Sequence, residues 1–541
     1  MSKKRALLYI FLPLIIASAI VLGIFLGAFL TPSNHPETLI FPQSQRFNTA
    51  TKLNEILNFI EETYVDSVDK TDLTERSIKS MLTTLDPHSY YIPAKEFNEM
   101  NEPLEGNFDG IGVEFRIKND TIIVISPIVN GPSDKIGIKA GDRIVKVDTT
   151  EVAGVGITNP KVIKLLKGPR GTKVTVEIIR HGTKGRKLFT ITRGRIPIFS
   201  IDAPYLIKDD IGYMRITRFA KTTYDEFMKA SRSLKNQGMK KLIIDLRSNG
   251  GGVLGAATQI ADEILRKNKM IVYTDGRARN RMEHFSTANG ILESCEIAIL
   301  INENSASASE ILAGAIQDND RGTIIGRRSF GKGLVQEQVM WPDGSGLRLT
   351  VARYYTPTGR CIQKPYNESI EQYQAEAYNR YDNGELLSAD SIQFPDSLKF
   401  YTPEGKVVYG GGGIMPDLFI PLDTNNGTNY LYTLRYNGTI QNFALNYVDK
   451  QRATLKARYT DAITFKNKFK VDNNLFNSII KFAEDNNIKR NLSEIKTSKK
   501  LISIGLKAAI SRNLFNDLGY YVIINESDKT VQKAISSFKK K

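Results

Sequence analysis

The sequence predicts a multidomain α/β protein with a layered α/β core, a β-rich domain before that core, and helical segments near both ends. Three observations lead to this fold class. The chain has 541 residues, which is more than one hydrophobic core usually serves. Short β-branched runs and glycine turns fill residues 96–195, and strands alternate with helices from 196 onward, as in layered α/β domains. Residues 425–541 instead carry apolar side chains at helical spacing.

The N-terminus predicts a membrane anchor. Residues 6–30 contain no charged side chain, and a run of this length can cross a bilayer as a helix. Lys3, Lys4 and Arg5 precede the run, so the positive-inside rule keeps that end in the cytoplasm. We therefore expect 1–32 to be a single-pass anchor in the cytoplasmic membrane, with the rest of the chain on the extracytoplasmic, periplasmic side. Export followed by signal-peptide cleavage is the alternative, although the apolar region of a signal peptide is normally shorter.

Residues 33–95 are predicted to be a linker followed by a helical module. Leu53, Ile56 and Ile60 fall on one face of a helix. A second helix is expected to end near Pro87, because proline disfavours a helical conformation in the residue before it.

The segment 96–195 combines short strands and glycine turns in a recognisable order. Gly110, Ile111 and Gly112 lead into a strand, and the stretch GPSDKIGIKAGDRI follows at 131–144. This order resembles a PDZ domain. The resemblance implies that backbone N–H groups of the Gly-Ile-Gly stretch hold the carboxylate of a protein C-terminus, while the bound tail adds as a strand to a sheet edge.

Composition narrows the function classes. The net charge is +16 at pH 7, but the sequence lacks zinc-finger spacing, basic-zipper heptads and aromatic RNA-binding signatures. We interpret the charge as a basic, soluble surface and expect no nucleic-acid partner. The two cysteines, Cys295 and Cys361, and four scattered histidines have no metal-ligand spacing. No metal or other cofactor is expected, and His88 is interpreted as structural.

Three segments of the α/β region carry residues suited to catalysis. The first, NENSASASEI at 302–311, lies where a strand is followed by a helix. A serine there presents its hydroxyl beside free backbone N–H groups at the positive end of the helix. Acyl transfer needs such groups to hold an oxyanion. From this segment alone, close helix packing with Ser305 as a helix cap is an equally open interpretation.

The second segment, GRRSFGKGLVQ, occupies 326–336. Its GxxxxGK spacing imitates a phosphate-binding loop, but Gly333 stands where that motif requires Ser or Thr, so nucleotide binding is not expected. A lysine between glycines can instead be buried, and desolvation lowers its pKa by several units from about 10.4. It can then accept a serine proton at neutral pH. Since no His/Asp pair is suggested, a Ser–Lys dyad is favoured.

The third segment, DLRSNGGGVL at 245–254, places three glycines after a buried strand. Glycines let the backbone approach a ligand closely and aim N–H groups at it. A plain strand-to-helix turn is the alternative for these residues alone. A polar, tyrosine-rich stretch at 366–400 is interpreted as an insertion or surface excursion.

Together these segments resemble the C-terminal processing peptidases, also called tail-specific proteases. The resemblance covers about 48–420 and includes LDPHS at 85–89, the PDZ-like stretch, the three segments above and GGIMPD at 412–417, in the family's order. It implies a layered, crotonase-like peptidase core at 196–424, preceded by the inserted PDZ domain. The helical residues 425–541 are expected to form a separate domain.

The resemblance also implies roles for individual residues. The middle serine of SASAS, Ser307, would be the nucleophile, Lys332 the general base, and Gln336 the residue that orients the lysine. The oxyanion hole would use the backbone N–H of Ala308 and that of a glycine in the NGGG turn, Gly251 by preference. The family usually has proline before the last two glycines, and this chain has glycine there.

These features predict a serine endopeptidase that captures the C-terminal tails of protein substrates and cleaves through an acyl-enzyme. A catalytically silent, membrane-anchored PDZ adaptor or chaperone is the alternative, against which the intact Ser307, Lys332 and Gln336 argue. A CoA-dependent enzyme with the same layered core is a third hypothesis, opposed by the PDZ domain and the export signal. Residues 425–541 could dimerise the protein into a homo-oligomer, cap the site or bind a partner, and self-association is the preferred of these three roles.

Overall fold

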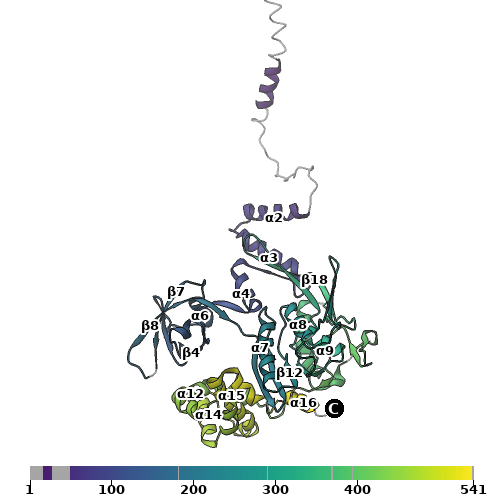
Figure 1. Ribbon diagram of the computed structural model, residues 1–541. Helices are drawn as coiled ribbons and strands as arrows, with labels where there is room; N and C mark the ends of the chain where they lie inside the picture. The colour runs from purple at the N-terminus through teal and green to yellow at the C-terminus, as the bar shows by residue number, and fades with distance from the viewer. Residues whose placement is uncertain are drawn as a thin grey trace, which may run out of the picture. The chain divides into compact units, whose positions relative to one another are not determined.

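The computed structural model describes residues 16–26, 49–180, 182–288, 290–366, 369–392 and 394–538 of the chain. The chain divides into two units, residues 1–76 and 77–541 (Figure 1).

In the first unit, residues 16–26 form a helix with exposed side chains. The rest of the predicted anchor lies outside the described residues. Among the residues that are described, no helix has the length and apolar character needed to cross a membrane. Helix α2 (Thr49–Thr63) contains the predicted apolar stripe, and α3 (Lys70–Thr83) begins in this unit. The Lys70 ammonium ties the two helices together by an ion pair of 2.9 Å to Glu61.

The second unit begins with short elements that connect its domains. Strand β1 (Tyr90–Ile92) is followed by α4 (Ala94–Glu105), and β2 (Asn107–Gly110) pairs with β9 (Gly194–Pro197). The two strands of this pair therefore form the entry to and the exit from the β-rich domain between them.

The β-rich domain is one sheet with two helices. Its strands run in the order β3-β4-β5-β7-β8, with β6 paired to β5, so β3 lies at an edge. Ile122, Val124 and Val176 point into its apolar core together with Val162 of α6. The elements are β3 (Val113–Lys118), β4 (Thr121–Pro127), α5 (Pro132–Lys135), β5 (Arg143–Val147), β6 (Thr150–Glu151), α6 (Asn159–Leu166), β7 (Lys173–Ile179) and β8 (Arg186–Thr192).

The α/β core is built on a six-stranded sheet in the order β10-β11-β12-β15-β16-β21. Its strands are parallel except for the antiparallel pair β10–β11. The central strands are continuous apolar runs, because a parallel sheet is covered on both faces. The strands are β10 (Ile201–Lys208), β11 (Ile211–Ile216), β12 (Lys241–Asp245), β15 (Glu296–Ile301), β16 (Thr323–Gly326) and β21 (Leu418–Phe419).

Helices α7 (Thr223–Asn236), α8 (Leu254–Asp262) and α9 (Ala308–Asp318) cover one face of this sheet (Figure 1). Every side chain of α9 is buried. A second sheet, in the order β1-β18-β13-β14 with β17 paired to β18, lies in the same domain. Its further strands are β13 (Met270–Gly276), β14 (Arg279–Phe285), β17 (Leu334–Met340) and β18 (Gly346–Tyr355).

The predicted insertion and the residues after it contain one helix, two 3-10 turns and a hairpin. These elements are α10 (Ile370–Asp382), η1 (Ala389–Ser391), η2 (Asp396–Leu398), β19 (Lys399–Tyr401) and β20 (Val407–Tyr409). The multidomain α/β class predicted from sequence is thus observed, with helices at the C-terminal end.

The C-terminal helices cover the other face of the six-stranded sheet. Their apolar side chains form one continuous core with sheet residues such as Tyr213, Leu300 and Ile325. The chain from 425 onward therefore packs directly on the α/β core. These helices are α11 (Asn429–Tyr436), α12 (Thr439–Arg458), α13 (Ala462–Lys468), α14 (Asn473–Asp485), α15 (Leu492–Ile524) and α16 (Lys529–Ser537).

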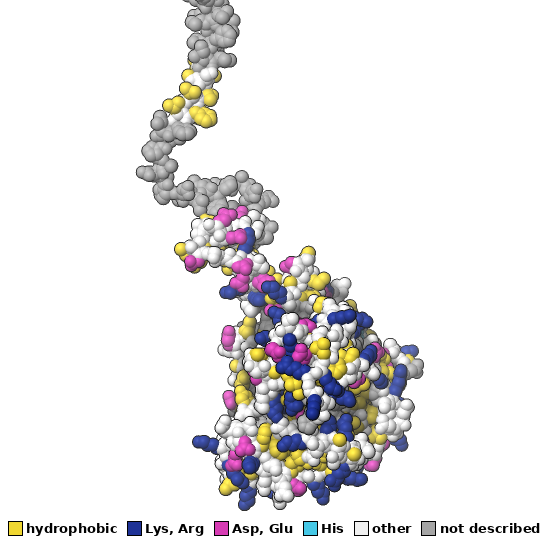
Figure 2. Space-filling view, turned by 90° about the vertical axis from the view of Figure 1, so that its left-hand side faces the viewer, with side chains coloured by type: hydrophobic (Ala, Val, Ile, Leu, Met, Phe, Trp, Pro, Cys, Tyr) yellow, Lys and Arg dark blue, Asp and Glu magenta, His cyan; other side chains and the backbone are white. Residues whose placement is uncertain are grey.

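Figure 2 shows how charge is distributed over one face of the molecule. Lys and Arg side chains are scattered among acidic and apolar ones on this face.

Candidate active site

Ser307 lies at the junction between β15 and α9. Its backbone has φ 55° and ψ −115°, a conformation that residues other than glycine adopt rarely and that persists only where the surroundings enforce it. Ala308 begins the helix, and its N–H has no acceptor among the described residues, as is normal for a first helical turn. The residue is half-buried, and Ser307 and Glu310 form a capping box at the start of the helix.

The glycine turn after β12 packs against the nucleophile segment. Gly251 has φ +95°, and a Cβ placed there would lie 2.7 Å from Ala306 O, 2.8 Å from Ser307 Cβ and 2.9 Å from Ala308 N. Only glycine fits so close to the serine. The Gly251 N–H donates to Asn249 Oδ1 at 2.9 Å, so in this structure it is directed at that side chain.

Lys332 lies just before β17, in the same cleft as Ser307. Its ammonium donates to Gln336 Oε1 at 2.9 Å, and Gln336 Nε2 donates to the His88 carbonyl. Burial lowers the pKa of Lys332 from its ordinary value, with a further decrease from the positive charge of Arg348. In the described residues no hydrogen bond joins Lys332 to Ser307. The structure therefore brings the predicted serine and lysine to one cleft, without a hydrogen bond between them among the described residues.

Glu310, which the sequence did not single out, links the serine segment to the lysine loop. The residue is completely buried. Its Oε2 accepts from the N–H groups of Ser307 (2.8 Å) and Lys332 (2.9 Å). Its Oε1 accepts from the Ser329 hydroxyl (2.5 Å) and the Gly331 N–H (2.7 Å). Burial raises the pKa of Glu310, although these four donors act in the opposite direction.

Tyr354 of β18 makes a second link between the same segments. Its hydroxyl lies 2.8 Å from the carbonyl oxygen of Lys332 and 3.2 Å from that of Ser307, and the side chain is buried. Tyr354 and Glu310 therefore hold the two backbone segments at a set separation.

The cleft around Ser307 is open and of mixed polarity. Polar and charged side chains enter it from α4 and β18, including Asn101 and Arg348. Its apolar lining consists of Leu104, Val253, Leu254, Ile311, Leu334 and Val335. A peptide chain with apolar side chains can be accommodated beside the serine. The described residues include no group of His, Cys, Asp and Glu arranged to hold a metal ion.

Comparison with known proteins shows the family to which this chain belongs. Residues 210–371 match peptidase family S41, and 110–188 match a PDZ domain. A carboxy-terminal-processing protease from Bartonella bacilliformis is 36% identical over 377 residues, which cover 67% of this chain and 84% of that protein. The chain belongs to the carboxy-terminal processing proteases.

The chain is also similar to a second curated relative and to a solved structure. Carboxy-terminal processing protease CtpB of Bacillus subtilis is 33% identical over 385 residues, or 70% of this chain and 78% of that protein. The solved photosystem II D1 C-terminal processing protease is 26% identical, with 69% of this chain and 87% of that chain covered and a TM-score of 0.36. Residues 33–96 match the activating protease CtpB N-terminal domain, and 430–516 match a family of unknown function. The protein is thus a C-terminal processing serine protease with a PDZ domain.

In the PDZ domain of the protease, the Gly-Ile-Gly stretch connects β2 to β3. The Ile111 carbonyl accepts from the N–H (3.0 Å) and hydroxyl (2.7 Å) of Ser133, and Gly112 has φ +74°. The N–H groups of Ile111 and Gly112 have no acceptor within the described chain. Two free N–H donors therefore lie beside the edge strand, while Gly110 belongs to the β2–β9 pair.

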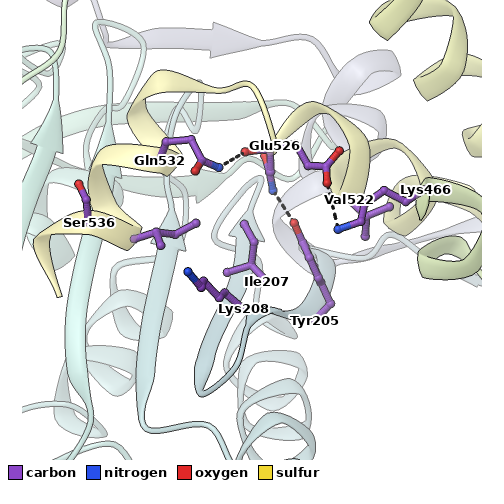
Figure 3. Close-up of a pocket in the computed structure, with 10 residues that line it drawn as sticks. Tyr205, Ile207, Lys208, Lys466, Val522, Glu526, Gln532 and Ser536 are labelled. Carbon is purple, nitrogen blue, oxygen red and sulfur yellow. Dashed lines mark hydrogen bonds and ion pairs between the residues drawn. The ribbon is translucent and has the colours of Figure 1, made fainter. Parts of the chain in front are cut away.

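A second hollow of the protease lies between β10 and the C-terminal helices (Figure 3). The Tyr205 hydroxyl accepts from the Asn525 side-chain amide at 3.1 Å. Figure 3 shows Glu526 directed at Lys466, with which it forms an ion pair of 3.1 Å. None of the predicted catalytic residues lines it. It is therefore separate from the active site.

Substituting Gly251 by alanine is expected to lower kcat/KM by about 10²–10³-fold, the loss typical of a disrupted oxyanion hole. The new methyl group would meet backbone atoms of the serine segment, which cannot move without displacing Ser307. Peptide cleavage and thermal unfolding would be measured together. Gly255→Ala is the matched control, because its methyl group meets nothing within 4 Å; equal activity of the two variants would contradict the packing argument.

Substituting Glu310 by glutamine is expected to lower the free energy of unfolding by about 2–4 kcal/mol, because an amide nitrogen would face N–H donors and leave buried groups unpaired. Activity should fall as the serine and lysine segments separate. Chemical denaturation monitors the first effect and peptide cleavage the second. Glu303→Gln, just before the same helix, breaks the ion pair with Arg327 and should lower the free energy of unfolding much less. A Glu310→Gln protein as stable as this control would refute the proposed link.

Proposed function

We propose that the protease cleaves peptides through a Ser–Lys dyad, with Ser307 as nucleophile and Lys332 as general base. The observation that carries this proposal is that the cleft combines a serine at a helix N-terminus with a half-buried lysine whose pKa is lowered by burial. Only a neutral amine can accept the serine proton, and burial favours the neutral form.

The mechanism needs Lys332 to move from Gln336 toward Ser307. Catalytic hydrogen bonds are often long or absent before substrate binds. Once aligned, Lys332 takes the hydroxyl proton as Oγ attacks the peptide carbonyl, and it returns that proton to the leaving amine. The acyl group is then joined to Ser307 as an ester. Lys332 removes a proton from a water molecule as its oxygen attacks this ester, and it returns the proton to Ser307 Oγ as the acid is released.

The oxyanion would be held by the Ala308 N–H together with a glycine N–H of the turn at 250–252. Ala308 is ready for this role because its N–H is unengaged within the described chain and carries the partial positive charge of the helix end. The Gly251 N–H would first have to leave Asn249. Its contact with the serine segment supports Gly251 as the second donor.

The PDZ domain would supply the preference for C-terminal tails. The free N–H groups of Ile111 and Gly112, with Gly110 beside them, can donate to a terminal carboxylate. The edge strand β3 can pair with the extended tail. We also propose the extracytoplasmic location expected from residues 6–30.

The test uses the full chain and an unstructured protein that ends in apolar residues, once with a free carboxylate and once with a terminal amide. Amidation should lower kcat/KM about tenfold to a hundredfold, the loss expected when hydrogen bonds to a charged group are removed. Acid quenching should trap an ester on Ser307, which mass spectrometry would detect. Equal cleavage of both substrates would exclude tail capture. Cleavage without an ester on Ser307 would exclude the dyad, and binding without cleavage would favour the adaptor alternative.

A further inference from the structure

Helix α10 packs behind the loop that carries Lys332, although its sequence indicated a surface excursion. None of its residues belongs to the described lining of the catalytic cleft, so it does not meet substrate there. Its contacts are instead with the lysine loop and with the turn at 86–89. Two routes connect it to the general base.

The first route runs through Tyr373. Its hydroxyl lies 2.7 Å from His88 Nε2, and the carbonyl of His88 accepts from Gln336, which in turn accepts from the Lys332 ammonium at 2.9 Å. Burial lowers the pKa of His88 to about 4, so at neutral pH its ring is uncharged and can accept the tyrosine hydroxyl. Tyr373 of α10 thereby holds the turn at 86–89, whose His88 carbonyl accepts from Gln336.

The second route runs through Arg380, which is 2% exposed. Its guanidinium donates to the carbonyls of Ser329 (2.8 Å) and Phe330 (3.1 Å), which lie three and two residues before Lys332, respectively. Glu376 of the same helix pairs with Arg380 at 2.6 Å and so neutralises a charge that would be costly to bury alone.

Lys364 joins the two routes. Its ammonium lies 4.2 Å from the ring centre of Phe330 and 4.0 Å from that of Tyr373, and it pairs with Glu376 at 2.9 Å. Buried charges are tolerated only when each is paired in a defined geometry. The network therefore specifies one position of the lysine loop relative to α10.

We propose that α10 positions the general base, with Tyr373 acting on Lys332 through His88 and Gln336. Tyr373 is a positioning residue and does not contact substrate in this arrangement. The proposal rests on the Ser–Lys function argued above. It assigns the insertion a role in aligning the lysine when substrate arrives.

The test is a double-mutant cycle on Tyr373 and Gln336 in the full chain, with cleavage of the free-carboxylate substrate as the readout. Tyr373→Phe keeps the ring beside Lys364 but removes the hydroxyl, and it should lower kcat about fivefold to tenfold with KM unchanged, the loss expected for one hydrogen bond. Tyr378→Phe, on the same helix and 78% exposed, should leave kcat unchanged.

Because Tyr373 acts through Gln336, the double variant should be no less active than Gln336→Ala alone. The proposal would be overturned if the losses in kcat of the two single variants multiplied in the double variant. It would also be overturned if Tyr373→Phe behaved like Tyr378→Phe. Thermal unfolding identifies any variant that loses activity by unfolding, and such a result for Tyr373→Phe would count as a structural role and against positioning. Full activity of Lys332→Met would instead remove the dyad on which the proposal rests.

Discussion

Replacing Ser307 by alanine is expected to reduce peptide cleavage by at least about 10⁴-fold, as removal of a nucleophile does in other serine peptidases. The fold should be little affected, because the Glu310 N–H that the hydroxyl faces in the capping box also donates to the Ser307 carbonyl at 2.8 Å and is not left unpaired. Cleavage of the unstructured substrate and thermal unfolding would be recorded on the same preparation.

Ser309, in the same SASAS run, is the matched control. Its buried hydroxyl donates to Asn249 O at 2.9 Å, so Ser309→Ala should lower the free energy of unfolding by about 1 kcal/mol and lower activity far less than Ser307→Ala. If Ser307→Ala retained substantial cleavage, another side chain would have to be the nucleophile.

Replacing Lys332 by methionine is expected to lower kcat by about 10²–10⁴-fold, the usual contribution of a general base. In the wild type, activity should rise with pH as the ammonium loses its proton. Burial lowers the pKa of Lys332, so this rise should occur below the pH at which an exposed lysine titrates. The pH dependence of kcat/KM would be measured, and Lys332→Met should lose this rise.

Lys221 provides a control for charge. It also lines the cleft but is exposed and paired with Glu105, so Lys221→Met removes the same charge without removing a buried amine. This variant should keep the rise with pH. If Lys332→Met and Lys221→Met had the same activity and pH profile, electrostatic attraction of substrate would be a sufficient role for both lysines.

Much of the active site was predictable because its chemistry depends on short stretches of sequence. A serine between a buried strand and a helix, and a lysine between glycines, are local patterns that the sequence shows directly. The three-glycine turn is equally local, and its close contact with Ser307 agrees with the need for glycine. The PDZ domain was predictable for the same reason, since its turns follow one another within a single segment.

The sequence by itself determined the family, the order of the domains and the residues that perform the proposed chemistry. Only the tertiary structure decided what holds those residues: Glu310 and Tyr354 between the serine and lysine segments, α10 behind the lysine loop, and the C-terminal helices on the sheet. The physical reason is distance along the chain. His88 and Tyr373, for example, are 285 positions apart, and no local periodicity or spacing reports a hydrogen bond that folding alone creates.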